Sequence, residues 1–233
     1  MKKVIACFLF LLLLGTAVLH YLHLDALLWH AWRLNGEAHQ HGGLLLNDYR
    51  VDVEERAIEG LRDDVSALTY NNETNTLFAV LNGEPLLVEL SLEGALLRKL
   101  RIDGVQDMEG LTHVSGNRYV VAEERSQRLL VIDVPPQAER IDVSNVPSLV
   151  IGLDLNGNKG FEGLSWDDKD KRLLVVKERD PLRVLSVTGF VDALAGGPMA
   201  VQIQELTSPG SPRLFMHDLS SLSLHDETGH LLL

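Results

Sequence analysis

Apolar residues follow two different patterns along this chain. The first is one uninterrupted stretch, Val4–Leu19, which contains no charged residue. Further along, the apolar residues form short runs that are rich in leucine and β-branched residues and are separated by polar turns; examples are Leu77–Leu81, Tyr119–Ala122 and Leu173–Val176. Short runs of this kind, without a helical period, predict strands. The sequence therefore predicts one N-terminal helix followed by an all-β domain.

A four-residue phrase recurs in the β region and leads each time through a polar turn into an apolar run. Its copies are Ser66–Thr69, Glu109–Thr112, Glu162–Ser165 and Ser220–Ser223, with spacings of 43, 53 and 58 residues. Each copy predicts a hairpin, and third strands are expected at Leu86–Leu90, Leu129–Asp133 and Leu182–Ser186, with a fourth strand at Leu96–Ile102 in the first copy. Repeats of three to four antiparallel strands are typical of propeller blades, whose period is roughly 40 to 50 residues.

The repeat predicts an all-β fold, a β-propeller behind an N-terminal membrane helix. Six blades of about 45 residues would need roughly 270 residues, whereas about 190 follow the apolar stretch. The fourth copy reaches only its second strand, where Leu231 corresponds to Leu77 of the first copy. We therefore expect a six-bladed propeller whose C-terminal part is truncated in this sequence.

The N-terminus has the features of an export signal. Lys2 and Lys3 precede the apolar stretch, which Tyr21, Leu22 and Leu24 extend to about 20 residues, near the length that spans a bilayer. Small residues suited to cleavage lie inside the apolar run and not after it, which favours an uncleaved anchor. The positive-inside tendency then leaves the two lysines in the cytoplasm.

We divide the chain into a signal anchor at residues 1–24, a juxtamembrane linker at 25–43 and the propeller at 44–233. The expected location is the cell inner membrane, which residues 4–24 cross once, with the propeller in the periplasm. Trp29 and Trp32 in the linker fit either an interfacial position or the start of a short helix that packs on the propeller.

Composition narrows the range of partners and activities. The formal net charge of −12 argues against a nucleic-acid partner, because such a partner requires a basic face. Cys7 is the only cysteine, so no intrachain disulfide can form. The sequence has no Gly-x-Ser-x-Gly elbow, phosphate-binding glycine loop or zinc-protease helix, and it therefore lacks the usual markers of nucleophilic catalysis and nucleotide hydrolysis.

Six short motifs follow the basic and apolar N-terminus. They are Tyr49–Val51, Asp64–Thr69, Leu90–Gly94, Asp107–Thr112, Glu123–Arg125 and Lys177–Arg179. Together they resemble the SdiA-regulated family of bacterial propeller proteins, from about Leu44 to the end of the sequence. The resemblance implies a membrane-associated or periplasmic propeller, similar to phytase-like propellers, with one branch of the family linked to calcium-responsive regulation and calcium homeostasis.

Four glutamates hold corresponding positions in two successive repeats. Glu109 and Glu162 begin the phrase on the expected innermost strand, and Glu124 and Glu178 follow 15 and 16 residues later. Their ring would continue through Ser66 and Ser220. Carboxylates that converge in a propeller channel repel one another, and a hard cation with six to eight oxygen ligands would relieve the repulsion. We predict a Ca²⁺ site at these four glutamates; the alternative is that each pairs with an arginine or accepts backbone amides between blades.

Two other patterns resemble metal sites less closely. Asp154–Asn158 resembles the start of an EF-hand loop, but its glycine is at the fourth position and not the sixth, so a turn is expected. Five histidines lie near the apolar stretch, at His20, His23, His30, His39 and His41. Their spacings fit no single helical face, and we interpret them as ordinary polar residues beside the membrane.

Three functions are open at this point. The leading interpretation is a non-enzymatic, membrane-tethered periplasmic propeller that binds calcium or a protein partner and contributes to calcium-responsive regulation or homeostasis. The second is a calcium-dependent phytase-like or lactonase-like hydrolase, in which calcium polarises an oxygen or activates water. The third is a metal-free interaction scaffold. Arg125, Arg128, Arg179 and Arg183 are too scattered along the sequence to decide between them.

Overall fold

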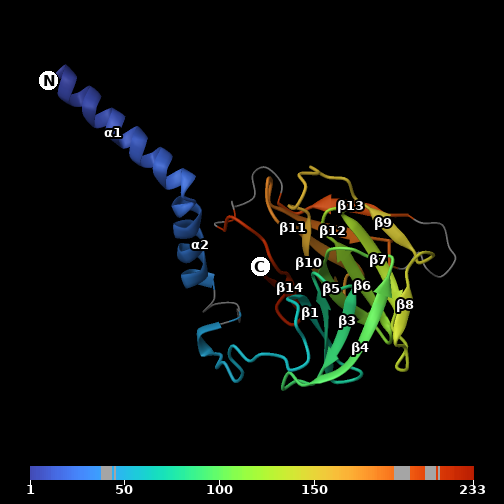
Figure 1. Ribbon diagram of the computed structural model, residues 1–233. Helices are drawn as coiled ribbons and strands as arrows, with labels where there is room; N and C mark the ends of the chain where they lie inside the picture. The colour runs from blue at the N-terminus through green and yellow to red at the C-terminus, as the bar shows by residue number, and fades with distance from the viewer. Residues whose placement is uncertain (38–43, 45, 192–199, 208–213, 215) are drawn as a thin grey trace. The chain divides into compact units, whose positions relative to one another are not determined.

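The computed structural model describes residues 1–37, 44, 46–191, 200–207, 214 and 216–233. The chain divides into two compact units, one of Met1–Tyr49 with Ser208–His217 and one of Arg50–Thr207 with Asp218–Leu233. The first unit is helical: α1 covers Lys2–Tyr21, α2 covers Leu24–Glu37 and a short 3₁₀ helix covers Leu46–Asp48 (Figure 1). The second unit is built of strands.

Helix α1 is the predicted apolar helix. Its 20 residues rise about 30 Å, which is the thickness of the hydrocarbon core of a bilayer. Among the described helices, α1 is the one long and apolar enough to cross a membrane. Helix α2 covers much of the predicted linker, which is therefore largely helical. The helix contains Trp29 and Trp32, whose rings lie 5.5 Å apart. Linker residues 38–43 lie outside the described part of the chain.

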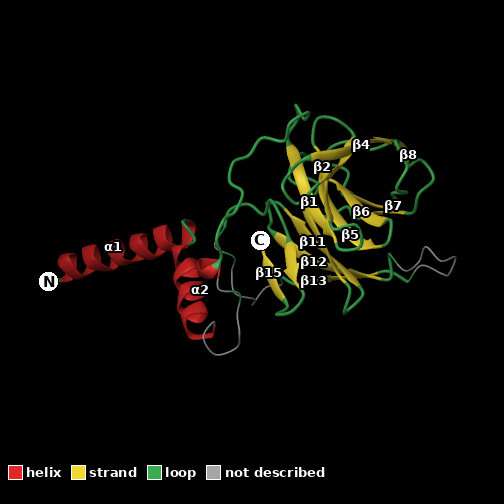
Figure 2. Cartoon of the chain, turned by 90° about the horizontal axis from the view of Figure 1, so that it is seen from below, coloured by secondary structure: helices red, strands yellow, loops and turns green. Residues whose placement is uncertain are grey.

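The strands of the second unit form four sheets in the described residues (Figures 1 and 2). The first contains β1 (Val65–Asn71), β2 (Thr76–Leu81), β3 (Leu86–Leu90), β4 (Leu96–Asp103) and β8 (Arg140–Asp142). The second contains β5 (Met108–Ser115), β6 (Arg118–Glu123), β7 (Arg128–Asp133) and β9 (Ser148–Val150). The third contains β10 (Phe161–Asp167), β11 (Arg172–Lys177), β12 (Arg183–Thr188) and β13 (Gln202–Glu205), and the fourth contains β14 (Ser223–His225) and β15 (His230–Leu232). All pairs are antiparallel except β4 with β8, which is parallel.

The sheets pack face to face as blades. Strand β7 illustrates the packing, because successive side chains of a strand point to opposite faces of its sheet. Leu130 and Ile132 belong to the apolar core that the second sheet shares with the first. Leu129 and Val131 belong to the core that it shares with the third. The second sheet is therefore covered on both faces by its neighbours, which is the arrangement of a propeller and confirms the predicted fold class.

The last residue of the repeated phrase links each blade to the next. Its hydroxyl oxygen accepts a hydrogen bond from the backbone N–H of the residue that follows the phrase in the next blade. The three bonds, each 3.0 Å long, run from His113 to Thr69, from Trp166 to Thr112 and from Leu224 to Ser165. An apolar residue at this position would leave the amide without a partner, which explains why Thr or Ser recurs there. The inner strands β1, β5, β10 and β14 consequently lie beside one another (Figure 1).

The second residue of the phrase must be small because the inner strands approach closely. A Cβ atom on Gly163 would lie 2.7 Å from the backbone nitrogen of Leu222 in the fourth repeat. Real Cβ atoms essentially never approach other atoms this closely. Glycine at this position therefore allows β10 and the fourth repeat to pack.

The predicted hairpins agree with the structure. The turn after β1 ends at Asn75, whose φ of 55° is in the left-handed region that asparagine tolerates. The fourth copy forms the two-stranded sheet of β14 and β15, as its similarity to the first copy predicts. Strands β8, β9 and β13 were not predicted, and the total of six blades stays a prediction.

Candidate metal centre

A β-bulge marks the first residue of the repeated phrase in three blades. The strand register shifts on either side of Ser66, of Glu109 and of Glu162, so each of these residues is left out of the ladder. A bulge changes the direction of the extra side chain, and bulges are enriched beside functional sites. Two of these bulges, at Glu109 and Glu162, are therefore at positions where the sequence predicted metal ligands.

The other two predicted ligands also hold equivalent places. Glu124 and Glu178 come directly after the ends of β6 and β11. The Glu124 N–H donates to the Asp107 carbonyl at 3.0 Å, and the Glu178 N–H donates to the Gly160 carbonyl at 2.9 Å. These bonds hold the end of each second strand beside the start of the inner strand, where the bulged glutamates lie.

The four predicted glutamates come together, and Asp107 joins them. Single ligand oxygens of Asp107, Glu109 and Glu124 all lie within 4.8 Å of one another, and so do those of Glu124, Glu162 and Glu178. Glu124 belongs to both groups, and only 1% of its surface is exposed to solvent. We call the five residues the carboxylate centre and the two groups its first and second triads.

Hydrogen bonds satisfy only part of the carboxylate centre. Glu124 Oε1 accepts the Gly160 N–H at 3.2 Å, and the Glu109 carboxylate is hydrogen-bonded to Ser66. The first of these bonds joins two blades, so Glu124 accepts a backbone amide between blades, as the alternative to a metal site predicted. It accounts for one oxygen of Glu124 and leaves the other available within the centre.

Arginines contact the centre at two points. Asp107 Oδ2 lies 3.0 Å from Arg125 Nε, and Glu178 Oε1 lies 3.0 Å from Arg179 Nη1. These two carboxylates therefore pair with arginines, as the alternative to a metal site predicted. Two buried oxygens of the centre make no hydrogen bond: Asp107 Oδ2, which is the atom paired with Arg125, and Glu178 Oε2. Buried polar atoms of this kind require an explanation, and an ion is one.

Burial raises the pKa of three glutamates in the centre. It is the largest cause in each case, and repulsion by the neighbouring carboxylates adds to it. The pKa of Glu124 rises to about 7 and that of Glu162 to about 8, and the pKa of Glu109 is also raised. Without a cation the centre therefore retains protons near neutral pH, because the ionised forms are disfavoured.

Asp107 is the centre residue that the sequence prediction missed. It lies two residues before Glu109 and has a φ of 56°, a left-handed conformation that aspartate tolerates. The corresponding residue of the third repeat is Gly160, where a Cβ atom would lie 1.9 Å from the Glu124 carbonyl oxygen. The sequence signal that could have identified Asp107 is an acidic residue two positions before the bulge. Only the second blade has one, because the third blade has Gly160 there.

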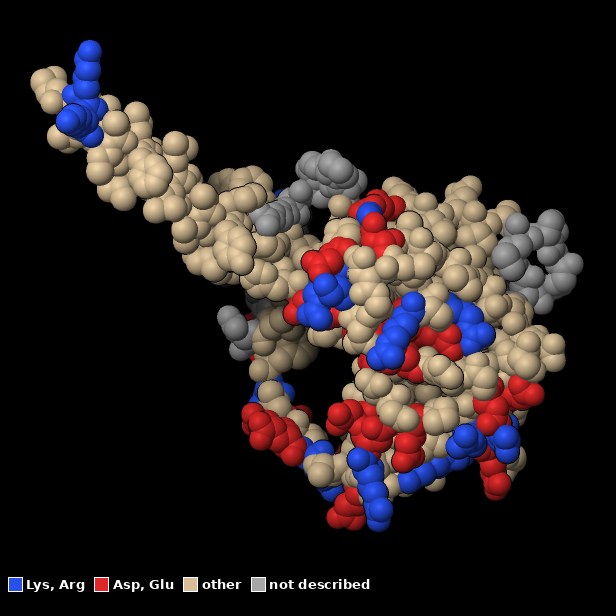
Figure 3. Space-filling model, turned by 45° about the horizontal axis from the view of Figure 1, so that its top comes forward, with Lys and Arg blue, Asp and Glu red and all other residues tan. Residues whose placement is uncertain are grey.

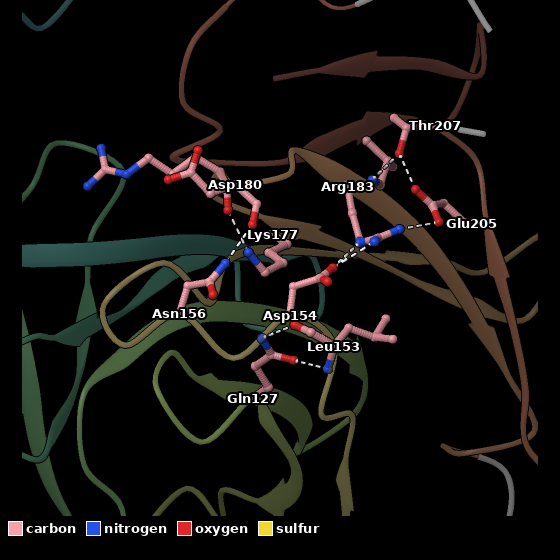
Figure 4. Close-up of polar contacts among 11 residues, drawn as sticks. Gln127, Leu153, Asp154, Asn156, Lys177, Asp180, Arg183, Glu205 and Thr207 are labelled. Carbon is pink, nitrogen blue, oxygen red and sulfur yellow. Dashed lines mark hydrogen bonds and ion pairs between the residues drawn. The ribbon is translucent and has the colours of Figure 1, made fainter. Parts of the chain in front are cut away.

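The loop that resembles an EF-hand is held by other side chains (Figure 4). Arg183 donates from Nε and Nη2 to Asp154 Oδ2 at 2.9 and 2.6 Å. Asn156 Nδ2 donates to the Asp180 carbonyl at 2.6 Å. The loop contributes no residue to the groups of candidate metal ligands found among the described residues. These contacts agree with its interpretation as an ordinary loop.

The histidines beside the apolar helix likewise form no candidate metal group in the described part of the chain. His20 Nδ1 lies 2.8 Å from an Asp25 carboxylate oxygen, and the His23 ring lies 4.5 Å from the His217 ring. His39 and His41 lie outside the described residues.

A hollow of about 550 Å³ opens beside the first triad. Its lining includes Asp107, Arg125, Ser126 and Arg128. Arg128 is bonded to the Glu123 carboxylate through Nε and Nη2 at 2.8 and 2.7 Å. Over the face seen in Figure 3, acidic and basic side chains are interspersed. The hollow places two arginines and a hydroxyl next to a candidate metal ligand.

These features define a β-propeller protein with a carboxylate centre contributed by its second and third blades. The family model of the SdiA-regulated proteins matches residues 42–233, and the chain belongs to this family. The resemblance that the six motifs indicated is thereby confirmed.

Solved structures that resemble the chain include two fungal proteins. The β-propeller domain of Myceliophteria thermophila Cps50 (Swd1) is 12% identical with a TM-score of 0.43, and the match covers 72% of this chain and 47% of that one. Kluyvelomyces marxianus Hsv2 is 14% identical with a TM-score of 0.38, and the match covers 64% of this chain and 50% of that one. The chain spans about half the length of these two structures.

Proposed function

We propose that this protein is a membrane-tethered propeller that binds calcium at the carboxylate centre and takes part in calcium-responsive regulation or homeostasis. The observation that carries the proposal is the pair of triads around Glu124. Five carboxyl groups converge there, and two of their buried oxygens have no hydrogen bond. A bound cation would supply a partner for Glu178 Oε2 and would lie beside Asp107 Oδ2, which also contacts Arg125 Nε at 3.0 Å.

The donor set favours calcium over other ions. Every residue of the two triads offers a carboxylate oxygen, and neither triad includes histidine or cysteine. Oxygen-only sites suit hard cations, whereas zinc and copper favour nitrogen and sulfur ligands. Calcium accepts six to eight oxygens in flexible geometry, while magnesium demands near-ideal octahedral geometry and usually keeps several waters. A crowded set of protein carboxylates therefore fits calcium best.

The N-terminal helix supports the proposed location. Helix α1 has the length and apolar composition of a membrane span, and Lys2 and Lys3 precede its apolar residues. By the positive-inside tendency these lysines stay in the cytoplasm, and the propeller is then on the outer side of the inner membrane, in the periplasm. A periplasmic propeller would respond to calcium outside the cytoplasm and would present its surface to a protein partner there.

The proposal is tested by thermal unfolding of the full chain in detergent, with calcium and with EGTA. Calcium is expected to raise the Tm of the wild-type protein, because a ligand that binds only the folded state stabilises it. Glu109→Gln and Glu162→Gln should each remove most of this rise. Glu139→Gln changes an exposed glutamate outside the centre and should leave the rise intact. A wild-type Tm that calcium does not change would reject calcium binding and favour the metal-free scaffold.

The hollow beside Asp107 favours a second candidate function, calcium-dependent hydrolysis of a phosphoester or ester. Arg125, Arg128 and Ser126 line the hollow and could hold an anionic substrate next to the centre. Calcium would supply polarisation of a substrate oxygen or activation of water. Release of p-nitrophenol from its phosphate or butyrate ester by the calcium-loaded wild type, but not by Glu162→Gln, would support this function. Calcium binding without turnover of either ester would support the non-enzymatic function.

A further inference from the structure

Helix α2 begins where the proposed membrane span ends. Only Leu22 and His23 separate α1 from α2. His23 has a φ of 57°, a left-handed conformation that ends the first helix, and its carbonyl already accepts the Leu27 N–H at 3.0 Å. If α1 crosses the bilayer, α2 therefore starts in the headgroup region on the outer side of the membrane.

The chain changes direction between the two helices (Figures 1 and 2). His20, in the last turn of α1, and Asp25, in the first turn of α2, meet across the bend, with His20 Nδ1 2.8 Å from Asp25 Oδ2. A helix that continued α1 in line would rise away from the bilayer, whereas a helix set at an angle to the span can lie along the bilayer surface. With 14 residues and a length of about 21 Å, α2 is too short to cross the bilayer itself.

One face of α2 is apolar and exposed. Leu24, Leu27, Leu28 and Trp32 recur at the three- and four-residue spacing that places side chains on one side of a helix. Leu28 is 65% exposed and Trp32 is 70% exposed, and the other two leucines are exposed as well. Ala26, on the opposite side of the helix, is buried. Helix α2 therefore turns its apolar side outward.

Lipid is the partner that this apolar face fits best. An amphipathic helix with leucine and tryptophan on its apolar face is typical of segments that lie in the bilayer interface, with that face at the boundary between headgroups and acyl chains. Trp29 is also exposed and its ring lies beside that of Trp32. Tryptophan is enriched at this level of the membrane, because its ring is apolar and its N–H is polar. Since α2 adjoins the apolar helix α1, the lipid around α1 would also reach the apolar face of α2.

We infer that α2 is a second membrane-contacting segment, which lies along the outer surface of the bilayer with Leu24, Leu27, Leu28 and Trp32 in contact with lipid. This inference rests on the proposed function, because it requires that α1 cross the membrane. Each of these side chains would add buried apolar area to the membrane contact. The chain would then stay at the membrane surface along the whole of α2.

Quenching of tryptophan fluorescence by brominated lipid tests the inference. The full chain is reconstituted in vesicles of phosphatidylcholine with bromine near the carboxyl end of one acyl chain, and in vesicles of the same lipid without bromine. A Trp29→Phe/Trp166→Phe variant keeps Trp32 alone, which lies eight residues beyond Leu24. If α2 rose away from the bilayer, Trp32 would be roughly 12 Å above Leu24, whereas along the surface it stays at the level of the lipid.

We expect bromine to remove at least half of the Trp32 emission. The matched control is Trp29→Phe/Trp32→Phe, which keeps Trp166 of β10 alone and should emit equally in both kinds of vesicle. Near-ultraviolet circular dichroism of each variant checks that it is folded. Two of the three tryptophans of the wild type lie in α2, so brominated lipid should also quench the wild type, and the inference stays testable if a substitution prevents folding.

The outcomes separate the inference from the proposed function. A chain that carbonate strips from the vesicles would reject the membrane tether of the proposed function and the inference with it. A chain that resists carbonate, but whose Trp32 emits equally with and without bromine, would overturn the inference and leave the proposed tether standing. The apolar face of α2 would in that case be covered by protein and not by lipid.

Discussion

Replacing Glu124 by glutamine is expected to stabilise the calcium-free protein at pH 8. In the unfolded chain this carboxyl group ionises at its ordinary pKa of 4.5, whereas burial raises its pKa to about 7 in the folded protein. Between these values the folded state keeps a proton that the unfolded state has released, so the free energy of unfolding falls as the pH rises through this window. Glutamine stays neutral and still has an oxygen for the Gly160 amide, so the variant avoids this loss.

The size of the effect follows from the change in pKa. A rise from 4.5 to about 7 corresponds to about 3 kcal/mol once the pH exceeds the folded value, at roughly 1.36 kcal/mol per unit. For a protein of this size 1 kcal/mol changes Tm by roughly 2–4 °C, so Tm should rise by roughly 6–12 °C at pH 8. At pH 5 the gain should be below about 1 kcal/mol, because the folded and unfolded states then differ little in bound protons.

Thermal unfolding in detergent with EDTA, followed by circular dichroism at pH 5 and pH 8, measures this difference. Glu139→Gln is the control, because it changes an exposed glutamate outside the centre. Calcium should narrow the difference between the two proteins, since a ligand at ~100 times its Kd adds roughly 2.7 kcal/mol to the protein that binds it. If Glu124→Gln melts no higher than the wild type at pH 8 without calcium, or gains equally at pH 5, the reasoning is refuted.

Three further predictions concern the links between blades and the membrane helix. Thr112→Val removes the acceptor of the Trp166 amide and should lower the free energy of unfolding by about 1–3 kcal/mol in urea, whereas Thr112→Ser should change it little. Gly163→Ala places a carbon 2.7 Å from a backbone nitrogen and should cost about 1–3 kcal/mol; Gly152→Ala, with its nearest neighbour at 3.8 Å, is the control and should melt like the wild type. The full chain should stay in the membrane pellet after carbonate extraction, and a chain lacking Lys2–Tyr21 should not; release of the full chain would contradict the anchor.

Repetition explains why much of the fold was predictable. The phrase that contains Thr112 occurs in four copies, so its hairpin, its turn and the strand after it are each indicated several times. The four glutamates were found in the same way, as equivalent positions in two repeats. Asp107 has no acidic counterpart at Gly160, and comparison of repeats could therefore not identify it. Strand β8 was missed for a related reason, because it is a three-residue addition to the edge of another blade's sheet.

The sequence by itself determined the local structure: strands from short apolar runs, turns from asparagine and aspartate, and an apolar N-terminal helix. These features depend on residues close together in the chain. Only the tertiary structure decided that Asp107 joins the four glutamates, how the five carboxylates divide into two triads and that Glu124 is common to both. Their convergence depends on the bulges, on the hydroxyl-to-amide bonds between inner strands and on the close approach at Gly160, where the backbones of two blades meet. Spacing along the chain cannot specify such distances, because they arise from the packing of whole blades.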